Sequence, residues 1–223
     1  MDIELVLAID ASTSVDVREF NLQWEGLARA FVHPDVVGAI SAVGDLGIAV
    51  TMVQWAGRGR HRTVVEWTFI NDEAGAARFS QKIATATRQV RGFTDIGGAI
   101  RYSAQSILNN QFEGARKVID VSGDGTSSTG SPALARDAAI QNGITINGLV
   151  IYNEEYDLGQ LASYDLRTHY ENHVIGGNAA FLMIAQDFND FARAIREKLV
   201  REIMGPPIAD RLKQDRFASH SPF

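Results

Sequence analysis

Cysteine is absent from the 223 residues of this chain, and its absence removes several kinds of chemistry at once. A disulfide framework, a zinc–thiolate centre and a cysteine nucleophile are all excluded. The absence leaves the cellular compartment open, because a domain of this size can bury enough apolar surface to fold without cross-links.

Long apolar runs and long basic runs are missing as well. No segment approaches the roughly 20 apolar residues of a membrane-spanning helix, so no membrane span is expected. The net charge of −6 and the lack of a Lys/Arg run argue against nucleic acid as a partner, because that binding depends on neutralising phosphates. The N-terminus has no basic stretch followed by an apolar core. The chain is therefore expected to be cytoplasmic, or periplasmic or secreted if a signal peptide was trimmed.

The sequence does contain an alternation of strand-like and helix-like segments. Strands are predicted at 3–9, 47–55, 62–69, 117–122, 145–151 and 181–184, with 62–69 returning antiparallel from the turn at 57–60. Helices are predicted from Asp16 to the stop at Pro34, at 72–87, 95–109, 132–142 and 158–170, and from Asp187 to the stop at Gly205.

These segments predict one α/β domain over residues 1–205, followed by a polar C-terminal tail over residues 206–223. The expected fold is Rossmann-like. Its central, mostly parallel sheet should have about six strands, with one antiparallel edge strand and helices on both faces.

Polar residues follow the predicted parallel strands, at the edge where such sheets bind ligands. Asp10, Ser12 and Ser14 follow the first strand, Asp124 follows the strand at 117–122, and Thr94 opens the helix between them. We expect these five side chains to meet and to surround one cation. Two carboxylates and three hydroxyls form an all-oxygen set. Such a set suits Mg²⁺ or Mn²⁺, with Ca²⁺ as a further candidate, and disfavours zinc and copper.

The same residues resemble the metal-ion-dependent adhesion site of von Willebrand factor A domains. Asp10, Ser12 and Ser14 match its Asp-x-Ser-x-Ser element, and Thr94 and Asp124 match its second and third elements. The resemblance covers residues 3–204, and phrases such as VIDVSGDG at 118–125 look like a bacterial branch of unknown function. It implies a von Willebrand factor A fold and a non-enzymatic, adhesion-type module. Such a module binds a protein or peptide whose Asp or Glu carboxylate reaches the cation.

An enzymatic alternative shares part of this pattern. Magnesium-dependent phosphatases and phosphotransferases of the haloacid-dehalogenase-like kind also place an aspartate after the first strand. They need a second aspartate two residues later as general acid, and Ser12 stands there, where a hydroxyl cannot serve at neutral pH. No lysine lies between Gly125 and Lys198 to assist phosphate chemistry. The sequence therefore favours a binding module over an enzyme.

Basic residues are expected beside the predicted cation. Arg58, Arg60 and His61 lie in the hairpin, and Arg88 and Arg91 precede the second element of the site. We interpret them as a ligand-binding rim, because local positive charge speeds encounter with anions and arginine can grip a carboxylate with two hydrogen bonds. The alternative for the hairpin residues is protection of an edge strand by charge.

Asp120 interrupts an apolar strand, where an unpaired charge is costly. It lies four residues before Asp124, which is roughly 13 Å along a strand, so the two side chains cannot hold the same ion. We predict that Asp120 is buried and hydrogen-bonded, with a structural role.

Overall fold

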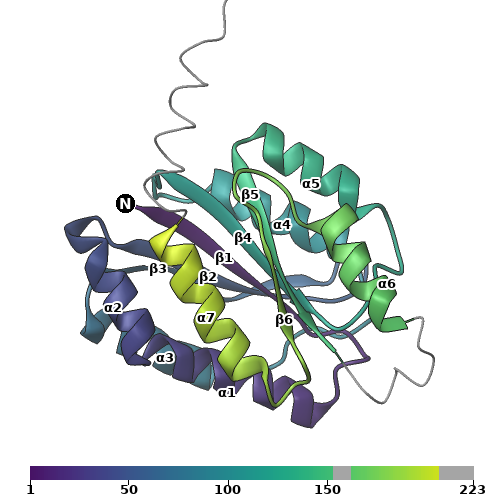
Figure 1. Cartoon of the computed structure of the whole chain (residues 1–223), viewed down its shortest axis with the longest axis horizontal. Helices are drawn as coiled ribbons and strands as arrows, with labels where there is room; N and C mark the ends of the chain where they lie inside the picture. Colours follow the sequence, from purple (N-terminus) through teal and green to yellow (C-terminus); the bar gives the residue numbers. More distant parts are fainter. Residues whose placement is uncertain (153–161, 206–223) are drawn as a thin grey trace, which may run out of the picture.

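A computed structural model describes residues 1–152 and 162–205, which form a six-stranded sheet with helices on both faces (Figure 1). The strands lie in the order β3-β2-β1-β4-β5-β6, and all neighbouring pairs are parallel except β2 and β3. The predicted fold class is confirmed, with β3 as the antiparallel edge strand. The strand bounds are β1 Ile3–Asp10, β2 Ile48–Trp55, β3 His61–Ile70, β4 Arg116–Gly123, β5 Ile144–Ile151 and β6 Leu182–Ala185.

Strand β1 shows how the sheet is buried on both faces. All eight of its residues are buried. Because successive side chains of a strand point to opposite faces, Leu5 and Leu7 enter one hydrophobic cluster, and Val6 and Ala8 enter the other. A strand covered on both sides requires a continuous apolar run, which is the pattern that the sequence shows.

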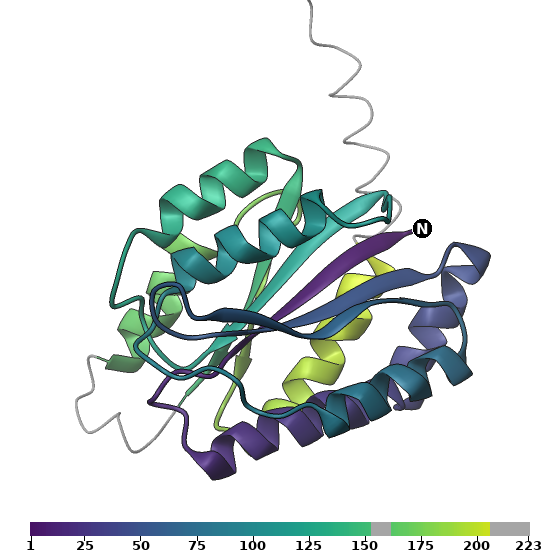
Figure 2. The same cartoon turned by 180° about the vertical axis from the view of Figure 1, so that it is seen from behind.

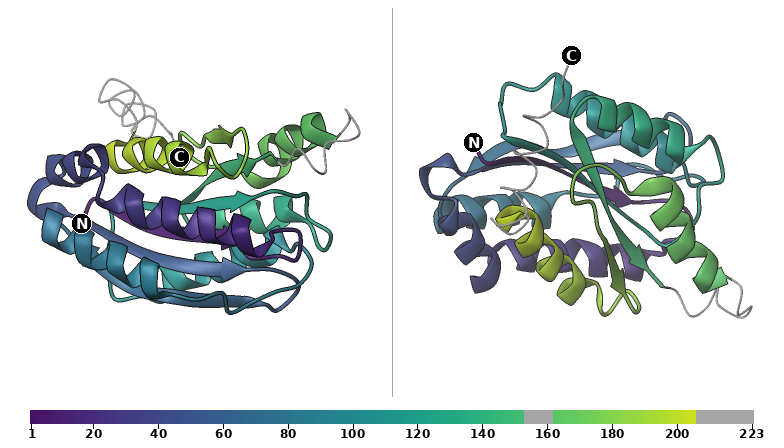
Figure 3. Two further views of the ribbon diagram at one scale, coloured as in Figure 1. Left: turned by 90° about the horizontal axis from the view of Figure 1, so that it is seen from below. Right: turned by 45° about the horizontal axis from the view of Figure 1, so that its top comes forward.

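The helices divide between these two clusters (Figures 2 and 3). α1, α2, α3 and α7 cover one face, and α4, α5, α6 and the turn η2 cover the other. No helix in the described ranges has the length and apolar character of a membrane span. The bounds are α1 Val17–Phe31, α2 Pro34–Ala42, η1 Gly44–Leu46, α3 Glu73–Thr85, α4 Ile96–Leu108, α5 Pro132–Gln141, α6 Ala162–His169, η2 Tyr170–Val174 and α7 Phe191–Met204.

Two helix boundaries differ from the prediction. Pro34 follows the end of α1, but it also opens α2, which is absent from the predicted elements. Proline suits the first helical position because no N–H is needed there. The last helix begins at Phe191 and not at Asp187. Asp187 lies in the turn before α7, where its carboxylate accepts a hydrogen bond of 2.8 Å from the Asp190 N–H. The predicted tail at 206–223, and residues 158–161 of a predicted helix, lie outside the described residues.

The strand order reverses between β1 and β4. From β1 the chain continues to β2 and β3 on one side, whereas from β4 it continues to β5 and β6 on the other. β1 and β4 are paired in register up to Ile9 and Ser122, so their carboxyl ends lie side by side. Ligands of open α/β sheets bind at such a reversal of strand order, and Asp10 and Asp124 stand at this one.

Candidate metal centre

Asp10 is the last residue of β1, and its side chain is fully buried. One carboxylate oxygen, Oδ1, accepts a hydrogen bond of 2.7 Å from the backbone N–H of Ser12. The other oxygen, Oδ2, is buried and has no hydrogen-bond partner among the described residues. A buried acceptor without a donor is costly, so this oxygen is available to a group that the protein itself does not provide.

A chain of hydroxyls connects the end of β1 to the end of β4. The hydroxyls of Ser12 and Ser14 lie 2.9 Å apart, and the Ser14 hydroxyl donates to Asp124 Oδ1 at 3.0 Å. Asp124 Oδ2 is buried and, within the described part of the chain, unpartnered, as Asp10 Oδ2 is. The structure thus brings together four of the five residues expected at the cation, from two strands that are far apart in sequence.

Thr94, the fifth residue, lies on a loop that is hydrogen-bonded to the serine loop. Its hydroxyl is 3.9 Å from the position that a Cβ atom on Gly125 would occupy, one residue beyond Asp124. The Thr13 backbone N–H and hydroxyl both donate to the Gly92 carbonyl at 2.8 Å. Thr94 does not cap α4, because Asp95 is the N-cap and accepts a hydrogen bond from the Gly98 N–H. The Thr94 hydroxyl therefore remains free of a capping role.

No cationic side chain pairs directly with either carboxylate in the described residues, although the charge of Arg88 lowers the pKa of Asp10 in part. Burial, and then the neighbouring Asp124, raise the pKa of Asp10 to about 8. Burial raises the pKa of Asp124 to about 6, although the hydrogen bond from Ser14 opposes the rise. Neither carboxylate forms an ion pair within the described residues. A divalent cation between them would remove this electrostatic penalty, so the residues fit such an ion.

Hydroxyls would have to complete any ligand set at this place. Within the described ranges, no three side chains of the His, Cys, Asp and Glu types gather to hold a metal. Two carboxylates with Ser12, Ser14 and Thr94 instead offer the hard oxygen ligands that Mg²⁺ and Mn²⁺ accept.

Arg88, which we expected in the rim, faces the loop that carries the two serines. Its guanidinium donates to the carbonyls of Ala11 at 2.8 Å, Ser12 at 2.5 Å and Val15 at 2.9 Å, and it lies 5.0 Å from the centroid of the Phe20 ring. These bonds fix the path of the backbone between Asp10 and the start of α1. Arg88 therefore positions the loop through its two terminal nitrogens, whereas its Nε has no hydrogen-bond partner among the described residues.

The other rim residues divide between surface and interior. Arg58, Arg60 and Arg91 are exposed, and the Arg60 guanidinium donates to the Arg91 carbonyl at 3.2 Å, so these two residues are neighbours. His61 is half-buried, and its ring stacks on Tyr102 with centroids 5.7 Å apart. Burial lowers the pKa of His61, which makes it a poor source of positive charge at neutral pH.

Two aromatic residues near Asp10 are absent from the predicted site. A Cβ atom on Gly123 would lie 2.9 Å from Asp10 Oδ2, 2.8 Å from the Tyr170 hydroxyl oxygen and 3.2 Å from Trp55 Cζ2. Tyr170 and Trp55 therefore enclose the unpartnered oxygen of Asp10, and both are fully buried. Burial raises the pKa of the Tyr170 phenol, so it stays protonated. No spacing in the sequence indicates this contact, because Tyr170 comes from the distant turn η2.

Asp120 lies apart from this centre. It is fully buried, and its Oδ1 is 2.8 Å from the ammonium of Lys198 on α7. The prediction that Asp120 is buried is confirmed, and its partner is a cation, with which it forms an ion pair.

The fold is that of von Willebrand factor A domains. The chain belongs to a family described as "Protein of unknown function (DUF1194)", whose pattern matches residues 1–207. No curated protein matches the chain.

Solved structures with this fold come from several sources. Proximal thread matrix protein 1 from the mussel byssus, with a zinc-occupied MIDAS motif, is 15% identical with a TM-score of 0.60, over 91% of this chain and 46% of that one. The pilus adhesin SpaC from Lactobacillus rhamnosus GG is 11% identical with a TM-score of 0.65, over 91% and 30%. A von Willebrand factor type A protein from Catenulispora acidiphila is 18% identical with a TM-score of 0.57, over 93% and 43%. The chain spans less than half the length of each.

Proposed function

We propose that this chain is a protein-binding module that holds one divalent cation, Mg²⁺ or Mn²⁺, and presents it to a carboxylate of an acidic partner. The ligands are Asp10, Ser12, Ser14, Thr94 and Asp124. The observation that carries the proposal is the pair of buried carboxylates, Asp10 and Asp124, which are connected through Ser12 and Ser14 and form no ion pair in the described part of the chain.

The character of the ligands supports an acidic partner. Three of the five side chains are neutral hydroxyls, so a divalent cation keeps much of its attraction for a further anion. Mg²⁺ releases its waters reluctantly, and a site with few charged ligands leaves a position for an external oxygen. A carboxylate is the anionic oxygen ligand that a protein partner can supply from Asp or Glu.

The comparisons support a divalent cation and a binding role. The mussel byssus protein is a matrix protein with a zinc-occupied MIDAS motif, and SpaC is an adhesin. We favour Mg²⁺ or Mn²⁺ over zinc because no thiolate or imidazole is among the proposed ligands, and Ca²⁺ would require a larger shell of oxygens.

Two observations favour binding over phosphate hydrolysis. Ser12 occupies the position where the phosphatase alternative needs a general acid, and its hydroxyl is bonded to Ser14. Lys198 is fully buried and paired with Asp120 and Glu202, so it is not available to a substrate at the carboxyl ends of β1 and β4. We therefore propose a non-enzymatic module.

Calorimetric titration of the full chain with Mg²⁺ or Mn²⁺ tests the cation site. We expect one weak site in the wild type and no measurable site in Asp10→Ala, with little change in thermal stability measured in EDTA. The matched control is Asp45→Ala, which removes an exposed aspartate and should bind the cation as the wild type does. Unchanged affinity in Asp10→Ala would refute the proposal.

Water-proton relaxation of the Mn²⁺-loaded chain tests the open coordination position. A water molecule on Mn²⁺ enhances relaxation, and sodium acetate should reduce the enhancement by taking its place. Acetamide has nearly the same shape without the charge, and it should have little effect. Equal effects of acetate and acetamide would contradict a site that accepts carboxylates.

A further inference from the structure

A groove of about 1050 Å³ lies beside the candidate metal centre, between α1 and the residues 84–91 that lead from α3 toward α4. Figure 2 shows this connecting segment running beside α1 after it leaves α3. This space, which we call the α1 groove, is lined on its basic and apolar sides by Phe20, Trp24, Arg29, Arg60, Val90 and Arg91.

The apolar side of the α1 groove is part of the packed core. Phe20 and Trp24 stack with ring centroids 4.5 Å apart, and both belong to the core under α1. Val17, at the first turn of α1, also lines the groove, and 62% of its surface is exposed. A large side chain from a partner can bury apolar surface here without a rearrangement of the protein.

The groove is basic on an acidic chain. Four arginines line it against a single acidic residue, Glu25, whereas the whole chain has a net charge of −6. Arg29 pairs with Glu25 at 2.8 Å, but both side chains are more than half exposed, so the pair contributes little and can be exchanged for a partner's carboxylate. Arg60 and Arg91 are exposed neighbours. This charge complements an acidic ligand.

The α1 groove is continuous with the loop at the cation. Arg88 lines the groove and also donates to the carbonyls of Ala11, Ser12 and Val15. Val17 lies three residues after Ser14, so one end of the groove begins where the serine loop ends. A partner segment bound at the cation can therefore continue along α1.

We propose that the α1 groove binds an acidic peptide segment that carries at least one large apolar side chain, and that this segment belongs to the partner whose carboxylate reaches the cation. The inference rests on the proposed function and extends it, because it names a second contact of the same partner. The apolar side chain packs toward Phe20 and Trp24, and flanking carboxylates pair with Arg29, Arg60 and Arg91.

The test uses a phage-displayed library of random dodecapeptides selected on the full chain in Mg²⁺, followed by synthesis of the most enriched peptide. We expect Asp and Glu around an aromatic or aliphatic residue.

The double variant Arg29→Glu/Arg91→Glu should lower the affinity for this peptide at least tenfold. Ala84→Trp, which fills the groove at an exposed position without changing charge, should weaken it at least fivefold. The matched control Arg62→Glu/Arg78→Glu reverses two exposed arginines outside the groove and should change affinity less than twofold.

Measurements in Mg²⁺ and in EDTA separate this inference from the proposed function. Binding that depends on Mg²⁺ but is equal in the wild type and both groove variants overturns the groove and leaves the cation proposal standing. Binding that ignores Mg²⁺ but is lost in the groove variants supports the groove and counts against the cation. Enrichment of basic or neutral peptides overturns the inference. Circular dichroism melting of each variant checks that the fold is retained.

Discussion

Strand β4 leads to two buried acidic clusters, one at Asp120 within it and one just past its carboxyl end, which the protein treats in opposite ways. At its carboxyl end, Asp124 joins Asp10 with no cationic side chain paired to either carboxylate among the described residues. Asp120 lies four residues before Asp124. It shares the ammonium of Lys198 with Glu202 of α7, at distances of 2.8 Å from Asp120 and 2.6 Å from Glu202. All three residues of this second cluster are at least 98% buried.

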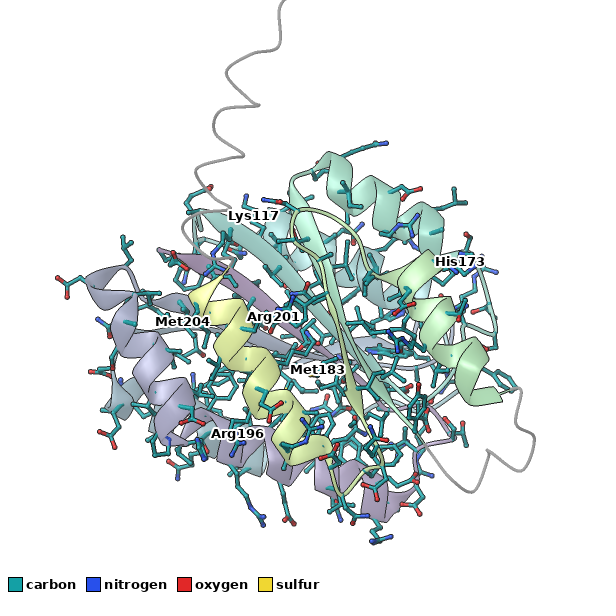
Figure 4. The ribbon with its side chains drawn as sticks, in the orientation of Figure 1. Lys117, His173, Met183, Arg196, Arg201 and Met204 are labelled. Carbon is teal, nitrogen blue, oxygen red and sulfur yellow. The ribbon has the colours of Figure 1, made fainter. Side chains whose placement is uncertain are left out.

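The second cluster receives a cation from within the chain, although Asp120 Oδ2 and Glu202 Oε2 have no hydrogen-bond partner among the described residues. The Asn147 side chain donates to Glu202 Oε1 at 2.9 Å, and the Lys198 ammonium lies 5.1 Å from the centroid of the Phe181 ring. Arg201 extends from α7 toward the β5–β6 side (Figure 4) and lies 3.8 Å from the same ring. Buried carboxylates need compensation, and here α7 supplies it. The comparison teaches that the missing ion pair at Asp10 and Asp124 is a property of that site, because the neighbouring cluster around Asp120 has a lysine from α7.

Removal of the internal cation should have the largest effect. Lys198→Met leaves Asp120 and Glu202 buried without a counter-charge, so the free energy of unfolding should fall by about 3–5 kcal/mol. Urea unfolding in EDTA measures the loss. Lys82→Met is the control, because Lys82 is exposed and donates only to the Thr68 hydroxyl, and it should change stability by less than about 0.5 kcal/mol. An unchanged urea midpoint for Lys198→Met would show that the two clusters do not differ as described.

The loss in Lys198→Met should also depend on pH. Burial already raises the pKa of Asp120 to about 7 with Lys198 present, and removal of the lysine leaves that effect unopposed. A carboxyl whose pKa is higher in the folded chain stabilises the fold at low pH and loses that contribution as the pH rises through the folded value. The difference from wild type should therefore be smaller at pH 5 than at pH 8. A difference that grows toward pH 5 would be inconsistent with buried, unpaired carboxylates.

Removal of one carboxylate from the same cluster should have a smaller effect. Asp120→Ala leaves Lys198 paired with Glu202, so we expect a loss of about 1–3 kcal/mol. Mg²⁺ affinity of the folded fraction should be intact, because Asp120 lies roughly 13 Å along the strand from Asp124. Calorimetry and urea unfolding on the same sample separate the two quantities. If the variant kept wild-type stability but no longer bound the cation, Asp120 would belong to the metal centre and the two clusters would not be separate.

Two glycines near the metal centre give the finest test. A Cβ atom on Gly123 would lie within 3.0 Å of Asp10 Oδ2 and of the Tyr170 hydroxyl, whereas on Gly125 the nearest atom is Thr94 Oγ1 at 3.9 Å. Gly123→Ala should displace Asp10 and lower Mg²⁺ affinity about tenfold, or roughly 1.4 kcal/mol. Gly125→Ala should bind Mg²⁺ like the wild type. Equal calorimetric affinities for both variants would mean that the position of Asp10 is not critical.

The fold could be predicted from the sequence because its signals are local. Continuous apolar runs mark the strands, and the capping box at Asp16 and Glu19 marks the start of α1. Asp10, Ser12 and Ser14 could be found because one short loop carries them. Helix α2 is missing from the predicted elements because Pro34 was assigned only to the end of the preceding helix. Proline is also favoured at the first position of a helix, which is where it stands in α2.

The partners of buried groups are harder to predict because they come from distant segments. Asp120 reads as a buried carboxylate, but its lysine is on the last helix. The sequence does contain a signal for the lysine. Phe191, Ile195, Lys198 and Glu202 are separated by four, three and four residues, which places Lys198 and Glu202 on the inward face of α7. Arg88 gives no such signal, since a loop arginine reads as surface, and only the structure shows its bonds to the carbonyls of Ala11, Ser12 and Val15.

The hydrogen bond from Ser14 to Asp124 joins residues that are 110 positions apart. The ligands therefore come together only after β1 and β4 have paired, and the unfolded chain offers the cation nothing comparable. Under the proposed function, Mg²⁺ binds the folded chain and not the unfolded one, so it raises the free energy of unfolding as its concentration rises. The concentration of the cation around the molecule then shifts the balance between folded and unfolded copies of the chain.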